Sequence, residues 1–247
     1  MRKISVPKGV ELVFTTDIHA HQEQFFKLID VIKPSEKTWL ICGGDLFDKG
    51  YGDDASFLII DKMIEMSYLG YCYTVLGNHD LRYKKKNKNN TNPSPQLSWI
   101  RTLPLSYTFE FYNGSLITIL HAGCSPKMTW DDLQTNTEVV YIRDLNKDER
   151  MIPLLWKEIN GVKTLVPAEP NGKSWHHYYQ GQYGYICSGH AANYSGEPKF
   201  YNYSLNLDCA VFETGILAGQ YFTAEGKLGE LVTVSGIPAK PKLNIQH

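Results

Sequence analysis

The nonapeptide CGGDLFDKG, residues 42–50, combines a tight turn with two carboxylates. It follows the apolar run at residues 39–41 and places paired glycines directly before Asp45. Paired glycines let the backbone turn sharply off a buried strand and let the next side chain approach a ligand without a clash. Asp48 follows Asp45 by three residues. A loop of this kind has a function if its acids meet partners from elsewhere in the chain.

The segments around this loop alternate between the hydrophobic periods of strands and helices. Strands that alternate with helices predict a parallel sheet flanked by helices. Asp53 or Asp54 is expected to cap the second helix, because a side-chain oxygen at that position accepts a free backbone N–H. The expected strands cover residues 10–15, 38–42 and 71–76, and the expected helices cover residues 21–32 and 54–68.

The second half of the chain is richer in β-strand signals. Asn113-Gly114 joins two β-rich runs, 107–112 and 116–121, and this pair of residues favours a hairpin turn. Residues 124–183 mix helical and loop signals. The chain has no internal repeat or low-complexity linker, so a single domain over residues 1–247 is expected. Further β-rich runs lie at residues 185–187, 201–212 and 217–234.

Composition is ordinary for a globular protein. Of the 247 residues 43% are hydrophobic and 21% are charged, and the formal net charge is −1. No bulk electrostatic argument therefore indicates a nucleic-acid or membrane partner. The basic run of Lys84–Lys86 and Lys88 lies among Asn and Pro residues. It indicates a solvated loop first and a polyanion contact second.

Five cysteines stand at positions 42, 72, 124, 187 and 209, without paired spacing. An odd number of unpaired cysteines in apolar surroundings favours a reducing compartment over a disulfide framework. The N-terminal segment lacks the apolar region of a signal peptide, and no apolar run approaches transmembrane length. The expected location is the cytoplasm, with no membrane contact and no sequence evidence for a stable protein partner.

Residues with metal-binding chemistry follow five of the expected strands. In an open α/β sheet, ligands bind beyond the carboxyl ends of the strands, so these loops should converge on one crevice. Carboxylate, imidazole and amide oxygen without thiolate suit manganese, iron or zinc, and Asp45 is the natural bridge between two ions. The residues at these strand ends are Asp17 and His19, Asp45, Asn78 and His79, His121, and His190.

Each element alone is weak evidence. An Asp-x-His is usually a surface turn, and a lone histidine such as His121 is more often a hydrogen-bonded core residue than a ligand. A glycine followed by Asn-His-Asp is more often a β-turn than a site. Five such elements in order, each at a strand end, indicate a metal centre.

This conjunction resembles the calcineurin-like metallophosphoesterases. In detail it is similar to the phosphoprotein-phosphatase branch, which includes bacterial and bacteriophage serine/threonine phosphatases and symmetrical diadenosine tetraphosphatases. The resemblance spans residues 12–220. The matching motifs are Asp17-Ile18-His19, residues 44–50 (Gly-Asp-x-x-Asp-Lys-Gly), Gly77–Asp80 (Gly-Asn-His-Asp), His121–Gly123, Gly189-His190 and the run 206–212.

The resemblance implies a four-layer α/β/β/α sandwich of two mixed sheets flanked by helices. It also implies two divalent metal ions, most consistent with manganese, with iron and zinc as alternatives. The first ion would be held by Asp17, His19 and Asp45. The second would be held by Asp45, Asn78, His121 and His190. The attacking group would be metal-activated water. His79 would be the proton donor to the leaving group, oriented by Asp48, because an imidazole beside a carboxylate can remain protonated near neutral pH.

The sequence departs from the family pattern beside this centre. Lys49 stands where the family usually has arginine, Asp80 where it usually has glutamate, and Ala191-Ala192 where it has Thr-Pro. Lysine lacks the planar fork of arginine, so two-pronged phosphate binding at position 49 is lost. Arg82 and Arg143 are the candidates to supply a fork.

Two other features remain open at this point. Arg143 matches an arginine of the bacteriophage enzymes, but an ordinary surface salt bridge is an equally good interpretation. His176 and His177 are expected to belong to a surface or substrate-facing aromatic segment rather than to a ligand set.

The expected function is a metal-dependent phosphatase that hydrolyses phosphomonoesters of the phosphoprotein type. A dinucleoside polyphosphate hydrolase and a nucleic-acid end phosphatase are the alternatives within the enzyme class. A non-catalytic scaffold ranks low, because such a scaffold would be expected to lose ligands or the histidine acid. Here every such position is filled.

Overall fold

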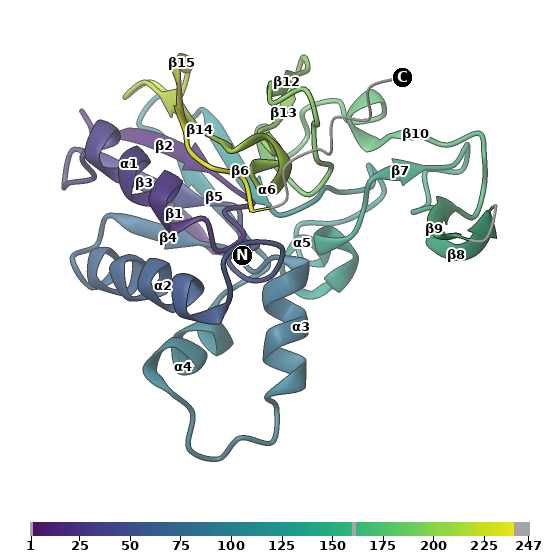
Figure 1. Cartoon of the computed structure of the whole chain (residues 1–247). Coiled ribbons are helices and arrows are strands. Elements are labelled where there is room, and N and C mark those ends of the chain that lie inside the picture. The colour runs from purple at the N-terminus through teal and green to yellow at the C-terminus, as the bar shows by residue number, and fades with distance from the viewer. Residues whose placement is uncertain (1, 160–161, 240–247) are drawn as a thin grey trace.

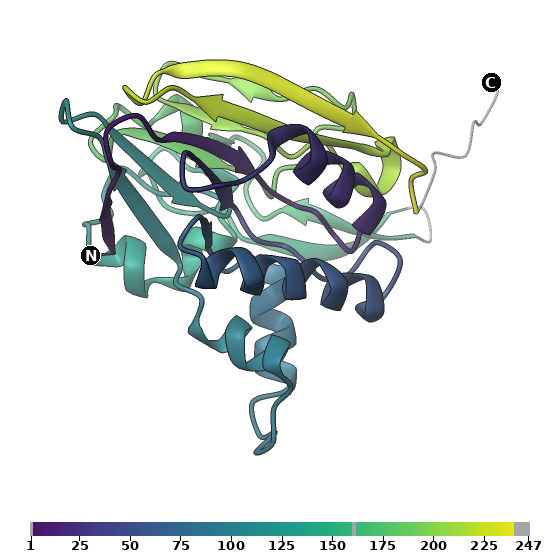
Figure 2. The same cartoon turned by 90° about the vertical axis from the view of Figure 1, so that its left-hand side faces the viewer.

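Two β-sheets pack face to face (Figure 2). Apolar side chains from both sheets fill the space between them. The computed structural model describes residues 2–159 and 162–239. Successive side chains of a strand point to opposite faces of its sheet. Phe14 and Ile41 of one sheet accordingly share a buried cluster with Phe109, Ile119 and Leu205 of the other. This cluster is the interior of the sandwich.

The first sheet has five strands in the order β15-β14-β2-β3-β4. The three strands β2, β3 and β4 are parallel, as expected from the alternation of strands and helices. The C-terminal hairpin turns at Gly226 and joins β2 in antiparallel orientation. The strands are β2 (Glu11–Thr15), β3 (Thr38–Cys42), β4 (Cys72–Thr74), β14 (Ile216–Phe222) and β15 (Leu228–Ser235).

Helices α1 (Gln22–Ile32) and α2 (Asp53–Tyr68) cover the outer face of this sheet (Figure 1). Buried residues of both helices share one apolar cluster with the outward side chains of β2 and β3. The expected side-chain cap of α2 is wrong. Gly52, with φ of 96°, is the N-cap. Asp53 and Asp54 lie in the first turn, where their negative charges interact favourably with the positive end of the helix dipole.

The second sheet has six strands in the order β1-β5-β6-β11-β13-β12. The expected hairpin at Asn113-Gly114 joins β5 and β6, while β6, β11 and β13 are parallel. The strands are β1 (Lys3–Ser5), β5 (Ser106–Glu110), β6 (Leu116–Leu120), β11 (Tyr185–Ser188), β12 (Lys199–Phe200) and β13 (Ser204–Asn206).

The layer outside the six-stranded sheet consists of short helical turns and loops. Trp175 and Val139 of this layer share a buried cluster with Leu120 and Ile186 of the sheet. The elements are α5 (Asp132–Thr135) and the 3-10 turns η1 (Thr137–Val140) and η2 (Trp175–His177). The expected α/β fold of two mixed sheets flanked by helices is confirmed, with a thin fourth layer.

Residues 144–174 add strands outside the sandwich. β7 (Asp144–Leu145) pairs with β10 (Lys173–Ser174), and β8 (Leu154–Ile159) pairs with β9 (Val162–Pro167). Figure 1 shows the β8–β9 hairpin standing apart from the two sheets. The mixed signals of residues 124–183 thus correspond to short elements rather than to one long helix or strand.

Two expectations about local structure are wrong. The β-rich run 201–212 holds only strand β13, followed by a loop and the short helix α6 (Val211–Thr214). The lysines at 84–86 are not in a loop. They form the last turn of α3 (Asn78–Lys86), which a loop connects to α4 (Pro95–Thr102). Lysines suit that position because the C-terminal end of a helix is partially negative.

All five cysteines are free and buried. None of the helices in residues 2–159 and 162–239 has the length and apolar character needed to cross a bilayer. The single-domain organisation stays a prediction.

Candidate active site

Loops from both sheets meet at the carboxyl ends of their parallel strands. The five-stranded sheet supplies Asp17 and His19 after β2, Asp45 after β3 and Asn78 after β4. The six-stranded sheet supplies His121 after β6 and His190 after β11. The loops converge as expected, but they do so between two sheets and not at the edge of a single one.

The first ligand group comprises Asp17, His19 and Asp45, all buried, with one ligand atom of each within 4.8 Å of the others. His19 Nδ1 donates to the carbonyl of Phe47 at 2.9 Å, which turns Nε2 toward the carboxylates. Nε2 lies 3.7 Å from Asp17 Oδ1 and 3.6 Å from Asp45 Oδ2. A backbone acceptor on the far ring nitrogen is the usual way in which a metal-binding histidine is oriented.

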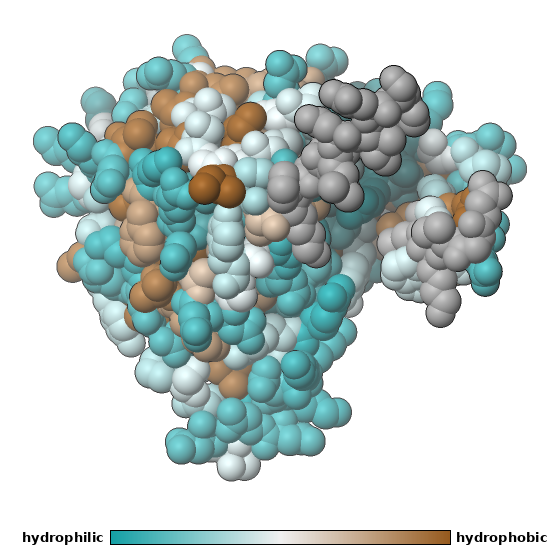
Figure 3. Space-filling view, viewed as in Figure 1, coloured by the Kyte–Doolittle hydropathy of each residue, from teal (hydrophilic) through white to brown (hydrophobic). Residues whose placement is uncertain are grey.

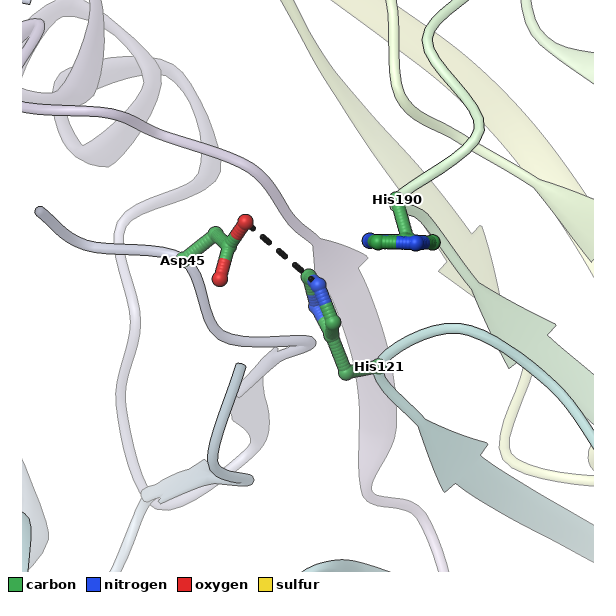
Figure 4. Close-up of side chains that lie close together, drawn as sticks. All are labelled: Asp45, His121 and His190. Atoms are coloured by element: carbon green, nitrogen blue, oxygen red, sulfur yellow. Dashed lines mark ion pairs between the residues drawn. The ribbon is translucent and has the colours of Figure 1, made fainter. Parts of the chain in front are cut away.

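The second group comprises Asp45, His121 and His190, with the same 4.8 Å limit (Figure 4). His121 Nδ1 donates to the carbonyl of Gly43 at 2.8 Å, and its Nε2 lies 3.4 Å from Asp45 Oδ2. Asn78 Oδ1 lies 2.9 Å from His121 Nε2 and 2.8 Å from His190 Nδ1. Asp45 belongs to both groups, as expected for a carboxylate shared between two ions.

The backbone at these positions is held in an unusual conformation. Asp17, His19 and Asp45 have φ of 52°, 47° and 58°, a region that residues other than glycine rarely adopt. Gly44, directly before Asp45, has φ of 89°, and a Cβ atom there would lie 2.5 Å from the backbone nitrogen of Gly77. The expected tight turn is therefore present. Strain of this kind clusters at functional sites, where the surrounding structure maintains it.

The charges of the buried carboxylates are held by neighbouring imidazoles. Burial alone would raise the pKa of Asp17, but its contact with His19 and the nearby His121 hold that pKa at about 2. Burial acts in the same direction on Asp45, and His121 and His19 hold its pKa well below the usual range. Both acids are therefore ionised in the folded protein at neutral pH.

The histidines respond in two ways. Burial lowers the pKa of His121, but Asp45 raises it more, to about 9, and Asp17 and Asp45 likewise leave the pKa of His19 raised. Burial, with His121 and Arg143 nearby, keeps the pKa of His190 well below its usual value. Protons on imidazoles thus balance two buried carboxylates, and a bound cation would displace those protons.

The geometry fits metal ions. Asp17 Oδ2 accepts hydrogen bonds from the Thr16 hydroxyl at 2.7 Å and from the His190 backbone N–H at 2.9 Å. Its other oxygen, Oδ1, is buried without a hydrogen-bond partner. A buried carboxylate oxygen without a donor is costly unless a cation faces it. The donor set of carboxylates, imidazoles and one amide, without thiolates, suits divalent manganese, iron or a catalytic zinc.

His79 lies beside the two groups. Its backbone N–H donates to Asp45 Oδ1 at 2.9 Å, and its ring Nε2 lies 3.9 Å from Asp45 Oδ2. Its Nδ1 donates to Asp48 Oδ2 at 2.6 Å, and Arg82 Nη1 lies 3.6 Å from the same oxygen. Burial lowers the pKa of His79, and Asp45 and Asp48 offset only part of that effect, so the carboxylates alone do not keep it protonated at neutral pH. A bound phosphate dianion would raise the pKa again.

The three candidate phosphate-binding cations lie at different depths. Arg82 is exposed, and its Nη1 lies 3.6 Å from Asp48 Oδ2. Lys49 Nζ lies 3.1 Å from His19 Nε2 and 4.7 Å from the centre of the Phe212 ring. Arg143 Nη2 donates to the carbonyl of His190 at 3.0 Å, while its buried Nε has no hydrogen-bond partner. The alternative interpretation of Arg143, an ordinary surface salt bridge, is wrong. None of the ion pairs among the described residues includes Arg143.

Two acids near the centre have roles that sequence reasoning missed. Asp80 is buried and accepts backbone N–H groups of Asp45 and Leu46 at 2.8 Å and of Gly77 at 3.0 Å, which joins two ligand loops. Asp208 is buried with Oδ2 unpartnered, and burial together with Asp17 raises its pKa to about 7. The available signal was an acid within an otherwise apolar or turn-forming run, which indicates a buried carboxylate.

Asp80→Asn should destabilise the fold and weaken metal binding together. An amide nitrogen cannot accept the N–H groups that the carboxylate accepts, so at least one buried donor is left unpaired, at a cost of about 1–3 kcal/mol. Chemical denaturation of the metal-free protein measures this free energy, and titration with manganese measures affinity. Asp148→Asn, at an exposed side chain, is the control. Wild-type stability in Asp80→Asn would show that the three hydrogen bonds do not support the loops.

A family model for calcineurin-like phosphoesterases matches residues 10–227. The match covers most of the chain and includes every loop of the site. The chain belongs to the calcineurin-like phosphoesterases. It is therefore a metal-dependent phosphoesterase, a hydrolase, and the two groups that share Asp45 are the candidate ligands for the family's dimetal centre.

Solved structures of similar fold include other calcineurin-like phosphoesterases. A protein provisionally described as a diadenosine tetraphosphatase superimposes with a TM-score of 0.70 at 21% identity, over 96% of this chain and 98% of that one. A serine/threonine phosphatase from Saccharomyces cerevisiae with similarity to human phosphatase PP5 gives 0.59 at 14% identity, over 96% and 84%. A metallophosphoesterase from Sphaerobacter thermophilus gives 0.51 at 13% identity, over 93% and 89%. No curated protein matches the sequence significantly.

His176 and His177 lie outside both ligand groups of this phosphoesterase. His176 is buried between the rings of Trp175 and Tyr201, each with its centre 4.0 Å away, and burial lowers its pKa to about 3. His177 is exposed beside Tyr201. The expected aromatic segment is present, and His176 is a packing residue.

Proposed function

We propose that this protein hydrolyses phosphate monoesters at a dimetal centre, with His79 as the proton donor to the leaving group. The observation that carries the proposal is the pair of ligand groups that share Asp45, with His79 beside them. We assign Asp17, His19 and Asp45 to one ion and Asp45, Asn78, His121 and His190 to the other. Manganese is the proposed metal.

The metal ions, when bound, would supply Lewis-acid polarisation of the phosphoryl oxygens and activate water at neutral pH. The side chains of the chain have separate tasks. Asp48 accepts the Nδ1–H of His79, which fixes the ring so that Nε2 faces the side where Asp45 lies. Protonated Nε2 then donates to the departing oxygen as the bond to phosphorus breaks. Arg82, beside Asp48, holds that carboxylate at the mouth.

Arg143 is the proposed phosphate-binding arginine. Its guanidinium is fixed to the carbonyl of the ligand residue His190, and its buried Nε–H has no partner, so this donor is left for an anion bound beside His190. A guanidinium offers two parallel donors to phosphate oxygens, which an ammonium cannot. Lys49 is directed at His19 and contributes positive charge rather than a two-pronged contact.

Arg143→Ala should raise KM for an aryl phosphate about tenfold or more, since hydrogen bonds to charged groups contribute about 1.5–3 kcal/mol. Lys49→Ala should raise KM less. Steady-state kinetics with saturating manganese makes the comparison, and Arg150→Ala, at an exposed arginine, is the control. Wild-type kinetics in Arg143→Ala would transfer the phosphate-binding role to Arg82.

A metal-dependent substrate screen tests the function as a whole. Purified protein, freed of metal and then reloaded with manganese, is assayed on a generic aryl phosphate, phosphopeptides, diadenosine tetraphosphate and phosphate-terminated oligonucleotides. We expect turnover only after reloading. Full activity in metal-free protein would contradict the proposal.

Dinucleoside polyphosphate hydrolysis is the second candidate. It is favoured by the structural neighbour described as a diadenosine tetraphosphatase, which this chain matches over nearly its whole length. Preference for diadenosine tetraphosphate over every monoester in the screen would establish it. A cytoplasmic location also stays a proposal, supported by five free, buried cysteines.

A further inference from the structure

Residues 81–109 carry six positive charges and no negative charge, in a chain whose net charge is −1. This concentration lies in α3, in the loop that follows it and in α4. The six cations are Arg82, Lys84, Lys85, Lys86, Lys88 and Arg101.

Helix α3 leads away from the catalytic centre. His79 lies in its first turn, and Arg82 and Lys86 follow at three and seven residues, so they share one face of the helix with His79. At a rise of 1.5 Å per residue, Lys86 lies about 10 Å further along the axis than His79. Figures 1 and 2 both show α3 and the loop beyond it projecting from the body of the molecule. A row of cations therefore starts beside the proposed proton donor His79 and continues along α3.

Internal contacts hold this projection in place without using most of its charge. Lys84 Nζ donates to the carbonyl of Arg101 at 3.0 Å, and Arg101 Nη2 donates to the carbonyls of Asn87 at 2.8 Å and Asn90 at 3.0 Å. Lys85, Lys86 and Lys88 are exposed and form none of the ion pairs found among the described residues. Their charges are free to meet a ligand.

Helix α3 and the loop beyond it expose no large apolar side chain. Figure 3 shows this projection as hydrophilic, and none of the exposed large apolar side chains lies within residues 70–111, all of which the structure describes. Asn87 separates Lys86 from Lys88, and Asn89, Asn90, Thr91 and Asn92 follow. Protein partners bury aromatic and aliphatic anchors in an interface core, whereas nucleic-acid backbones are contacted by Lys, Arg, Asn and Thr. The composition fits a polyphosphodiester and not a peptide.

We propose that the α3 ridge, defined as Arg82, Lys85, Lys86 and Lys88, binds the phosphodiester backbone of a nucleic acid whose terminal phosphate enters the active site. This inference rests on the proposed phosphomonoesterase function and names its substrate class. In the reaction, water forms a new bond to phosphorus and the bond between phosphorus and the terminal sugar oxygen breaks. His79 gives that oxygen its proton. The products are a hydroxyl end and inorganic phosphate.

The binding test uses the variant Lys85→Gln/Lys86→Gln/Lys88→Gln. Glutamine keeps helix propensity and removes charge. The matched control, Lys33→Gln/Lys37→Gln/Lys227→Gln, removes the same charge from exposed lysines at the opposite ends of the strands. Metal-loaded protein is titrated with a fluorescent single-stranded oligothymidylate without an end phosphate, so that no hydrolysis occurs. Each lost phosphate contact reduces the magnitude of the slope of log affinity against log salt concentration by about 0.7. The slope of the ridge variant should therefore be smaller in magnitude by about 2 than that of the wild type, and the slope of the control should not change.

The kinetic test compares two substrates. The ratio of kcat/KM for a phosphate-terminated oligonucleotide to kcat/KM for an aryl phosphate should fall about tenfold or more in the ridge variant and stay constant in the control. An unchanged ratio, or an equal loss in the control, would overturn the inference. So would an equal loss on a phosphopeptide of the same net charge, since the ridge would then attract any polyanion. Failure of the phosphomonoesterase function is seen separately, as no turnover of any substrate, while the salt slope still tests the ridge.

Discussion

Asp45→Asn should reduce metal-dependent turnover to background and remove most of the bound metal. Asp45 is the residue common to the two ligand groups, and its Oδ2 lies within 3.6 Å of both His19 and His121. An amide keeps the size of the side chain but has no charge and only one oxygen. Each site therefore loses charge compensation, and the two ions lose their shared ligand. No other described residue is a member of both groups.

Three measurements check this result. Metal analysis after reloading with manganese should give close to two ions per wild-type chain and far fewer in the variant. Manganese should raise the melting temperature of the wild type, because a ligand that binds only the folded state stabilises it, and should not raise that of Asp45→Asn. Asp30→Asn, at an exposed carboxylate, should behave as the wild type. Two tightly bound ions in Asp45→Asn would end the assignment of a shared ligand.

His79→Ala should keep both metal ions and lose about 10²–10⁴ in turnover. Its ring is not a member of either ligand group, and its Nδ1 is taken by Asp48. The backbone N–H that donates to Asp45 is retained in alanine. The substitution therefore removes the proton donor without removing a ligand.

The loss should depend on the leaving group. A phosphoserine or a nucleic-acid end leaves as a poor alkoxide and needs the proton, so its turnover should fall most. A nitrophenyl phosphate leaves as a stabilised phenoxide and should fall least. Asp48→Asn should give the same order in milder form, because it misorients the imidazole without removing it. Kinetics on these substrates with saturating manganese provides the comparison.

Two outcomes would contradict a proton-donor role. An equal loss on every leaving group would make His79 structural, and loss of metal in His79→Ala would make it a ligand. Asp61→Asn, at an exposed carboxylate on α2, is the control for Asp48→Asn.

Local pattern was sufficient for most secondary structure near the site. Strands β2 and β3 and helices α1 and α2 begin and end within a residue or so of the expected positions, because each has a clear apolar period and a turn at its end. Prediction was wrong where sequence composition and context disagree. The lysines at 84–86 look like a loop by composition, yet the helix that starts at Asn78 continues through them. The run 201–212 looks β-rich, but Asp208 and Ala210 interrupt it with a loop.

The order of motifs determined the ligand candidates before any geometry was known. Each of these residues follows a strand, and neighbouring parallel strands of one sheet end at the same edge. The residues are Asp17, His19, Asp45 and Asn78 in one sheet and His121 and His190 in the other. The tight turn before Asp45 was also predictable from the sequence, because the positive φ of Gly44 is a local property of the chain that glycine favours. The sequence by itself therefore determined the family, most of the secondary structure around the site and the candidate metal ligands.

Tertiary structure alone decided how these residues act together. Packing of two sheets brings His121 and His190 of one against Asp17 and Asp45 of the other, and no local signal specifies that pairing. It also placed Arg143 on the carbonyl of His190 and extended the cations after His79 along a projecting helix. The physical reason is the distance along the chain over which each property is determined. Turns and periods depend on neighbours within a few residues. Burial, pKa values and ligand distances depend on chain segments that lie far apart in the sequence and meet only when the core forms.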